Sequence, residues 1–198
     1  MHQNYVPAMR LRRLKRVDTR AYRGVRLEAS LDPAFAMSSA SFESVNDSGI
    51  YRAFLMSPQG WVIGAFHQHQ MLGIVHLDPA AIQQEYVLWG LYVTQNDRQT
   101  GVGGALALRV INIAQSLSAT AVRLHVSGSN HAAKRLYQRL GFVNQMDRVN
   151  ALQTDTDLTL KPTAAAMAHE NLDGSELMVC HLQAGMIGND ELPDQRRC

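Results

Sequence analysis

Residues 88–104, which read LWGLYVTQNDRQTGVGG, decide the fold of this chain. The run Glu85–Val93 is rich in aromatic and apolar residues on both faces, and this composition predicts a buried central strand. Gly90 inside the strand predicts a bulge or a close backbone approach. A polar, glycine-rich turn, Gln95–Gly104, then leads into a helix that we expect to begin near Ala105.

A glycine-rich turn between a strand and a helix is suited to bind an anion. Glycines let main-chain N–H groups turn inward without Cβ clashes, and the first helical turn offers unpaired donors at the positive end of its dipole. The turn lacks the Gly-Lys-Ser/Thr of a P-loop, and Leu106, three residues after Gly103, breaks the dinucleotide fingerprint. The turn alone therefore predicts only an anion site.

A second segment, residues 129–142, narrows the identity of that anion. It reads SNHAAKRLYQRLGF and resembles the Asn-x-x-Ala-x-x-Leu-Tyr-x-x-x-Gly-Phe segment of the GNAT (Gcn5-related) N-acetyltransferase superfamily. The pattern Arg98-x-x-Gly101-x-Gly103 resembles the acetyl-CoA signature of the same superfamily. The resemblance implies an α/β (α+β) fold in one domain, with a mixed, mostly antiparallel sheet, helices on both faces, and acetyl-CoA in a split of the sheet.

The resemblance also implies how the chain holds acetyl-CoA as its cosubstrate. Main-chain groups near Leu91, Tyr92 and Val93 would pair with the pantetheine arm, as an added strand pairs with a sheet edge. N–H groups of the turn would hold the pyrophosphate. These donors belong to Arg98, Gln99, Thr100, Gly101, Val102, Gly103 and Gly104.

Two further residues receive roles from the resemblance. Asn130 would hydrogen-bond the cofactor arm, and Tyr137 would stand near the thioester sulfur as general acid. Asn130 is equally typical of a helix N-cap, and Tyr137 also fits the core-facing stripe of a helix. Thr100 and Gly104 depart from the family, whose members often carry basic residues there, so we expect the phosphates to depend more on main-chain donors.

The reaction also needs a base, because an alkyl ammonium of pKa about 10 must lose a proton before it attacks a thioester. Glu85, at the start of the central strand, is the candidate. Histone-acetylating relatives carry their glutamate at the position that matches Val87, so an exposed strand-end carboxylate is the other interpretation of Glu85. His76 on the neighbouring strand and a chain of water molecules are two more candidates.

Apolar periodicity predicts the remaining elements and one domain over residues 1–183. Between the last two strands, residues 147–175 form a long polar loop, and residues 184–198 have no apolar period and read as a flexible tail. The other expected elements are a helix over Thr19–Leu31 with Asp18 as N-cap, a hairpin of Trp61–Phe66 and Met71–Leu77, a helical stripe over Leu106–Leu117, a strand at Val122–Val126, and last strands from Phe142 and over Leu177–Leu182.

Composition excludes several classes of protein. The chain has 198 residues, 46% hydrophobic and 18% charged, and it has no apolar run long enough for a membrane span, so we expect a cytoplasmic protein. Two cysteines and scattered histidines predict no metal site. Basic residues crowd residues 10–26, where Asp18 is the only acid. We interpret them as a solvated face rather than a nucleic-acid site or an organellar transit peptide.

We therefore predict an acetyl-CoA-dependent N-acetyltransferase that acetylates a primary amine of a small molecule or peptide by direct attack. A non-catalytic acyl-CoA-binding regulatory module is the alternative from another class. An enzyme that acetylates proteins or aminoacyl-tRNA is a third. We expect no membrane partner, and a homodimer is an open alternative to a monomer. No motif names the acceptor.

Overall fold

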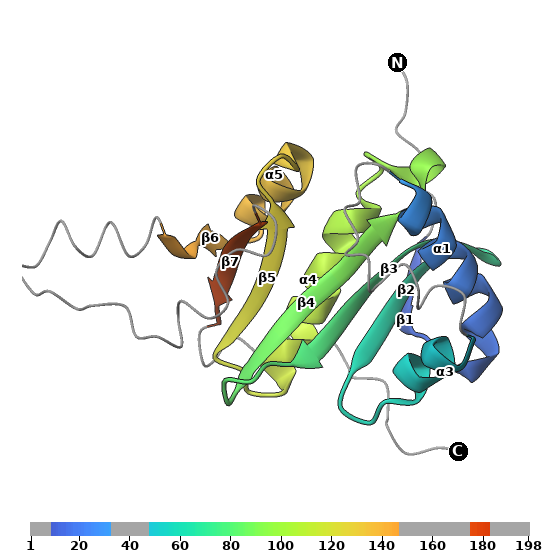
Figure 1. Cartoon of the computed structure of the whole chain (residues 1–198), viewed down its shortest axis with the longest axis horizontal. Helices are drawn as coiled ribbons and strands as arrows, with labels where there is room; N and C mark the ends of the chain where they lie inside the picture. The colour runs from blue at the N-terminus through green and yellow to red at the C-terminus, as the bar shows by residue number, and fades with distance from the viewer. Residues whose placement is uncertain (1–8, 33–47, 147–174, 183–198) are drawn as a thin grey trace, which may run out of the picture.

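The computed structural model describes residues 9–32, 48–146 and 175–182, with only the main chain for Ser48 and Ile50 (Figure 1). The predictions for residues 147–174 and 183–198 lie outside this described part. Within it, seven strands form one sheet in the order β1-β2-β3-β4-β5-β7-β6. All neighbouring strands are antiparallel except β4 and β5, which run parallel.

The strands and helices that were predicted with bounds lie close to their predicted places. The strands are β1 (Arg10–Arg13), β2 (Trp61–His67), β3 (Gln70–Pro79), β4 (Glu85–Val93), β5 (Ala121–Ser127), β6 (Val143–Asn144) and β7 (Ser175–His181). The α-helices are α1 (Thr19–Leu31), α3 (Ser48–Met56), α4 (Val102–Ser116) and α5 (His131–Arg139), with 3-10 turns η1 (Arg16–Asp18) and η2 (Gln95–Asp97). None of these described helices is long and apolar enough to cross a membrane.

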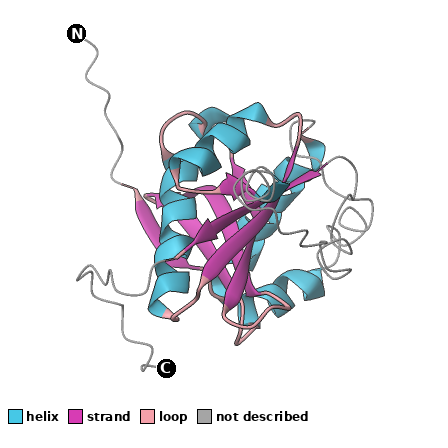
Figure 2. Cartoon of the chain, turned by 90° about the vertical axis from the view of Figure 1, so that its left-hand side faces the viewer, coloured by secondary structure: helices cyan, strands magenta, loops and turns pink. Residues whose placement is uncertain are grey.

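Helices pack on both faces of the sheet, as the resemblance implies (Figure 2). On one face the apolar stripe of α4, including Leu106 and Val110, packs against residues of β2 to β5 and β7. On the other face α1 and α3 contribute Tyr22 and Tyr51 to a smaller aromatic cluster that also takes in Tyr92 from β4. The central strand β4 is therefore buried from both sides, which explains its apolar and aromatic composition. This arrangement confirms the predicted fold class.

Strands β4 and β5 pair only at their N-terminal ends. Their parallel register covers three residue pairs, which begin with Glu85 and Ala121 and end with Val87 and Arg123. Beyond that point β4 stays paired with β3, β5 stays paired with β7, and the two strands diverge (Figure 1). The sheet is thus split at its centre, with the edges of two strands facing each other across the gap.

A bulge distorts β4 at the predicted position. The β3–β4 register shifts between Ile74 and His76, and Gly90 has a φ of +60°. That left-handed conformation is one that glycine adopts without strain. The bulge therefore explains why a glycine interrupts an otherwise bulky strand.

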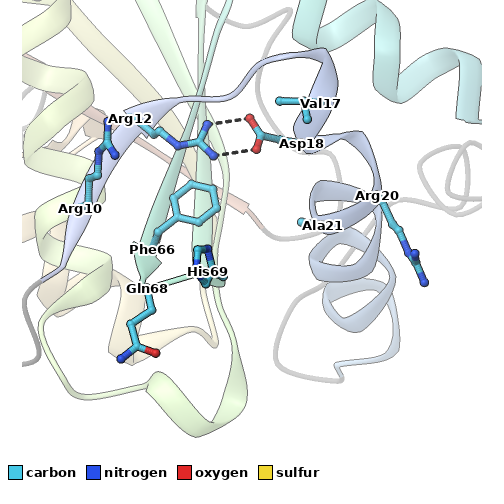
Figure 3. Close-up of a pocket in the computed structure, with 9 residues that line it drawn as sticks. All are labelled: Arg10, Arg12, Val17, Asp18, Arg20, Ala21, Phe66, Gln68 and His69. Carbon is cyan, nitrogen blue, oxygen red and sulfur yellow. Dashed lines mark hydrogen bonds and ion pairs between the residues drawn. The ribbon is translucent and has the colours of Figure 1, made fainter.

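Two local predictions differ from the structure. Helix α4 begins at Val102 rather than near Ala105, so the last two glycines of the turn belong to its first helical turn. Asp18 occupies the N-cap position of α1, but its side chain makes no capping hydrogen bond. Its carboxylate instead accepts two hydrogen bonds of 2.7 Å from the Arg12 guanidinium (Figure 3). It also accepts one of 2.8 Å from the Lys15 main-chain N–H.

The Arg12–Asp18 ion pair ties β1 to the start of α1 and is a testable contribution to stability. Hydrogen bonds from Arg12, assisted by the Lys15 N–H, hold the pKa of Asp18 below its usual range. A carboxyl whose folded pKa is depressed contributes stability above its unfolded pKa of about 3.9 and loses it as pH falls through the folded value. We therefore expect D18N to lower the free energy of unfolding by about 2 kcal/mol at pH 7.

Urea unfolding of both proteins at several pH values checks this expectation. The difference between wild type and D18N should shrink below about pH 4, where the carboxyl gains its proton. R10Q serves as the control, because Arg10 on the same strand is exposed and forms no ion pair with the described residues, and it should change stability by less than about 0.5 kcal/mol. A constant difference between wild type and D18N down to pH 2 would contradict the role of the ion pair.

Candidate functional site

A cleft of about 660 Å³ lies where β4 and β5 diverge. Its walls come from the C-terminal half of β4, from the glycine-rich turn and the start of α4, and from one face of α5. Leu91, Tyr92 and Val93 line it from β4, and Asn130 lines it from the start of α5. The structure thus brings the predicted strand, turn and asparagine together around one space.

The turn and the first turn of α4 present an unbroken run of free main-chain donors. Within the described part of the chain, the N–H groups of residues 99–104 have no hydrogen-bond acceptor, and the first helical bond runs from the Ala105 N–H to the Gly101 carbonyl. Gly101 is the N-cap residue and has a φ of +90°. Six consecutive donors at the positive end of a 15-residue helix form a strong anion site.

The Arg98 side chain links the turn to the end of β4 and to the residue after α1. Its Nε donates to the Val93 carbonyl at 3.2 Å, and its guanidinium forms an ion pair with Asp32 just after α1. The Tyr92 hydroxyl also donates to Asp32, at 3.2 Å, and to Glu28, also at 3.2 Å. Burial and these two carboxylates raise the pKa of Tyr92 to about 12, so it stays a hydrogen-bond donor at neutral pH.

Helix α5 contributes cationic side chains that the sequence analysis did not single out. Arg135 and Arg139 both line the cleft, together with Leu136. They lie four residues apart and thus share a helix face. They add to Arg98 of the turn, whereas Thr100 and Gly104 carry no charge. A search for basic residues at helical spacing beside the predicted Asn130 cap would have found them.

A comparison of the sequence with models of known protein families identifies the family of this chain. The model of the Acetyltransferase (GNAT) family matches residues 26–142, more than half of the chain. The chain belongs to the GNAT acetyltransferase family. A comparison with curated proteins gave no match.

Solved structures agree with the GNAT fold. PaiA N-acetyltransferase from Thermoplasma acidophilum, in complex with coenzyme A, is 17% identical with a TM-score of 0.66 over 88% of this chain and 99% of that one. Ribosomal-protein-alanine N-acetyltransferase from Brucella melitensis is 18% identical with a TM-score of 0.64 over 87% and 99%. A chimera of the Vibrio cholerae spermidine N-acetyltransferase with hSSAT is 18% identical with a TM-score of 0.61 over 87% of this chain and 95% of that one. At these identities the likeness shows the fold alone.

In this GNAT chain, Asn130 and Tyr137 sit at the start and in the middle of α5. The Asn130 side-chain oxygen accepts a hydrogen bond of 3.0 Å from the Ala133 N–H, so the residue is an N-cap and keeps its amide N–H₂ as a donor. Tyr137 is 6% exposed and packs edge-on against Phe142, with ring centroids 5.6 Å apart. Tyr137 belongs to the core cluster and, like Glu85, is not among the residues that line the cleft, although its neighbour Leu136 is. Its hydroxyl hydrogen-bonds to none of the described residues, and burial raises its pKa.

Glu85 lies at the paired end of β4, opposite Ala121 of β5, and is not among the residues that line the cleft. Its carboxylate forms a two-point ion pair with Arg123, whose guanidinium also donates to Gln145 at 3.2 Å. A carboxylate held in this way is poorly placed to accept a proton from a substrate in the cleft. The assignment of Glu85 as base therefore stays a prediction, and its placement does not favour it.

His76 is buried on the α1 side of the sheet. Its Nε2 lies 2.9 Å from the Tyr22 hydroxyl, and its ring stacks on Trp89 with centroids 3.8 Å apart. Burial, with the charge of Arg26, lowers the pKa of His76 well below its usual value, so the ring is neutral at pH 7. The side chain is thus a neutral part of the aromatic cluster rather than a solvent-exposed base.

A second hollow, of about 730 Å³, lies between β1, the β2–β3 turn and the start of α1 (Figure 3). Its best-placed cation, Arg12, is already paired with Asp18 and lies 4.2 Å above the Phe66 ring centroid. Arg20 points away from that pair (Figure 3). The Arg12 charge in this hollow is thus already used in contacts within the protein.

Within the described residues, no group of three or more histidine, cysteine or acidic side chains is arranged to hold a metal ion.

Gly103 offers a direct test of the cleft. A Cβ at this position would meet only Leu136 and Val93, both at 3.5 Å and both lining the cleft. G103A should therefore fold normally and gain up to about 1 kcal/mol in helix propensity. The new methyl group would occupy space beside the free N–H groups, so the affinity for CoA should fall about 10- to 100-fold.

Isothermal titration calorimetry with CoA measures this effect. The matched control is G24A, because Gly24 lies within α1 and a Cβ there would meet nothing within 4 Å. G24A should be as stable as G103A or more so, and its affinity for CoA should equal that of the wild type. Unchanged CoA affinity in G103A would contradict the location of the site.

Proposed function

We propose that this GNAT chain transfers an acetyl group from acetyl-CoA to a primary amine of a small molecule or peptide. The observation that carries the proposal is the run of six N–H groups at residues 99–104, which have no acceptor among the described residues. Four of these residues, Gln99, Gly101, Gly103 and Gly104, line the cleft between the diverging strands. The CoA pyrophosphate is the anion that we place on them, with Arg135 and Arg139 beside its phosphates. The structural relative PaiA N-acetyltransferase, which is in complex with coenzyme A, supports this choice of cosubstrate.

The pantetheine arm fits the open edge of β4. From Leu88 onward, no described strand pairs with β4 on the side that faces β5. The amides of the arm would use main-chain groups near Leu91, Tyr92 and Val93, as an added strand does. The free amide N–H₂ of Asn130 would donate to the arm from the opposite wall. The thioester would then lie near the Gly90 bulge, with main-chain donors for the developing oxyanion.

The proposed reaction is direct attack without a covalent enzyme intermediate. The neutral amine nitrogen bonds to the thioester carbonyl carbon, and the carbon–sulfur bond then breaks. Tyr137 donates its hydroxyl proton to the leaving thiolate, and the proton lost by the new amide restores the hydroxyl through solvent. Because burial raises the pKa of Tyr137, the hydroxyl holds its proton at neutral pH until the thiolate forms.

The role of Tyr137 is tested by Y137F. This change removes one hydroxyl group and no packing, so the free energy of unfolding should stay within about 0.5 kcal/mol of the wild type. We expect kcat to fall about 100-fold or more, with the Kd for acetyl-CoA unchanged, because general acid catalysis is worth at least that factor. Release of CoA thiol with an acetylated amine measures the rate. A kcat equal to that of the wild type would remove Tyr137 from the mechanism.

The base in this proposal is water that leads from the cleft to bulk solvent, because Arg123 holds Glu85. E85Q should leave kcat and its pH profile within about twofold of the wild type, an effect below the usual size of a general base. It should lower the free energy of unfolding by about 1 to 3 kcal/mol, because the charged hydrogen bonds to Arg123 are lost. A 100-fold loss of kcat at unchanged stability would instead make Glu85 the base.

A non-catalytic acyl-CoA-binding module is the second candidate. It is favoured by the ion pair of Glu85 and by the burial of His76, which leave no described side chain as an obvious base. A turnover screen of amines, polyamines, aminoglycosides and short peptides with acetyl-CoA separates the two. An enzyme releases CoA with at least one amine, whereas a binding module releases none. The cytoplasmic location and a homodimer stay predictions.

A further inference from the structure

Arg26 lies on the buried face of α1. Its neighbours on that face are Tyr22, Val25 and Ala29, which follow the three- and four-residue spacing of a core-facing stripe. Arg26 is only 7% exposed, although it lies within a segment whose other arginines are mostly solvated. A guanidinium in such a position normally has a carboxylate or several carbonyl partners.

Arg26 has no such partner in the described part of the chain. It forms none of the four ion pairs and none of the hydrogen bonds found there. Asp78, which acts on Tyr22 as Arg26 does, accepts a hydrogen bond of 2.5 Å from Trp89 Nε1. The acids on and just after the same helix, Glu28 and Asp32, accept hydrogen bonds from the Tyr92 hydroxyl. Within the described residues, Arg26 is thus largely buried and has no carboxylate partner. Its guanidinium nitrogens keep some contact with solvent, because His67 Nδ1 is the fully buried side-chain nitrogen found without a partner in this part of the chain. A ligand could therefore still reach the guanidinium.

The guanidinium lies against the β4 bulge. A Cβ built on Gly90 would lie 3.2 Å from Arg26 Nη1 and 3.1 Å from His76 Cδ2, so only glycine leaves room for both side chains. The Trp89 ring centroid is 5.8 Å from Arg26 Cζ. Residue 91, next along the strand, lines the cofactor cleft. The guanidinium thus lies beside Gly90, and the next residue of β4 lines the cleft.

We propose that Arg26 binds the carboxylate of the acceptor, so that the acceptor is an amine that also carries a free carboxylate group, such as an amino acid or a short peptide. This inference rests on the proposed function and names its substrate class. A carboxylate held by the guanidinium on the α1 side of β4 would direct the amine toward the bulge. Arg26 is thus a specificity-determining residue, and it takes no part in bond making.

The surroundings favour a single carboxylate over other acceptor groups. The rings around Arg26 belong to Tyr22, Tyr51, Phe54, His76 and Trp89. His76 is neutral, and in the described structure no cation other than Arg26 lies over these five rings, although the exposed Arg23 also affects Tyr51. One positive charge balances one carboxylate, whereas a phosphate dianion would remain half compensated. Polyamines and aminoglycosides would bring further positive charge toward an unpaired guanidinium. A planar guanidinium also matches a carboxylate with two parallel hydrogen bonds.

The test uses matched acceptors that differ only at the carboxylate. The L-amino acids and dipeptides with free C-termini are compared with their C-terminal amides, and spermidine is included as a polyamine. We expect the wild type to acetylate its best free acid with a kcat/KM about 10- to 100-fold above that of the matching amide. In R26Q this ratio should fall to about one through a higher KM for the acid, and R26K should recover part of it.

Two controls separate a specificity role from a general one. R20Q removes an exposed arginine of the same helix and should keep the wild-type ratio. R26M replaces a largely buried charge that has no counter-ion among the described residues with an apolar side chain, so its Tm without ligands should equal or exceed that of the wild type. Saturating free acid in the presence of CoA should raise the Tm of the wild type and leave that of R26M unchanged.

Several results would overturn this assignment. One is a wild-type enzyme that prefers amides or spermidine to free acids. Another is an R26Q variant that keeps the wild-type ratio of kcat/KM for the free acid to kcat/KM for the amide, or that loses kcat equally for both. A Tm of R26M below that of the wild type would also overturn it. Failure to acetylate any free acid while CoA binds also overturns it, and it leaves the CoA site standing. Failure to bind CoA at all would instead contradict the proposed function.

Discussion

The divergence of β4 from β5 is the constraint on which the rest of this structure depends. Three parallel residue pairs fix the two strands at one end, and each strand then follows its antiparallel partner away from the other. The main-chain groups along the facing edges lose their usual ladder partners, and such groups need a substitute from water or from a ligand. Helix α4 points its unpaired N-terminal donors toward the same opening. The cleft is thus a property of the backbone before any side chain is considered.

The two faces of the sheet carry different side chains, which suit different ligands. On the α4 side, the cleft offers main-chain donors and the arginines of α5, which suits a phosphate-bearing cofactor. On the α1 side, aromatic rings surround Arg26 at the Gly90 bulge, and Arg26 has no ion-pair partner among the described residues. The two faces are joined through β4 and through the ion pair of Arg98 with Asp32, which ties the cofactor turn to the end of α1. In this account β4 brings an acyl donor and an acceptor to one bulge from opposite sides.

Local features of this fold could be predicted from the sequence, and distant pairings could not. The hairpin, the central strand, the bulge and the anion-binding turn follow from composition and glycine placement over a few residues. The partner of Arg98 is 66 residues away and that of Glu85 is 38 away, so neither is visible as a spacing. The start of α4 was placed too late because glycines are poor helix formers. Arg26 looked like one more charge in a basic run, since only burial distinguishes it.

The most direct measurement of the central claim is an NMR titration of the ¹⁵N-labelled protein with CoA, read at individual backbone amides. If the pyrophosphate binds at the start of α4, the largest shift changes should fall on the amides of residues 99–104, with smaller changes at Leu91 and Val93. The amides of β1, beside the second hollow, should not move. Changes concentrated on β1 and the β2–β3 turn, or none near residues 99–104 at saturating CoA, would contradict the account.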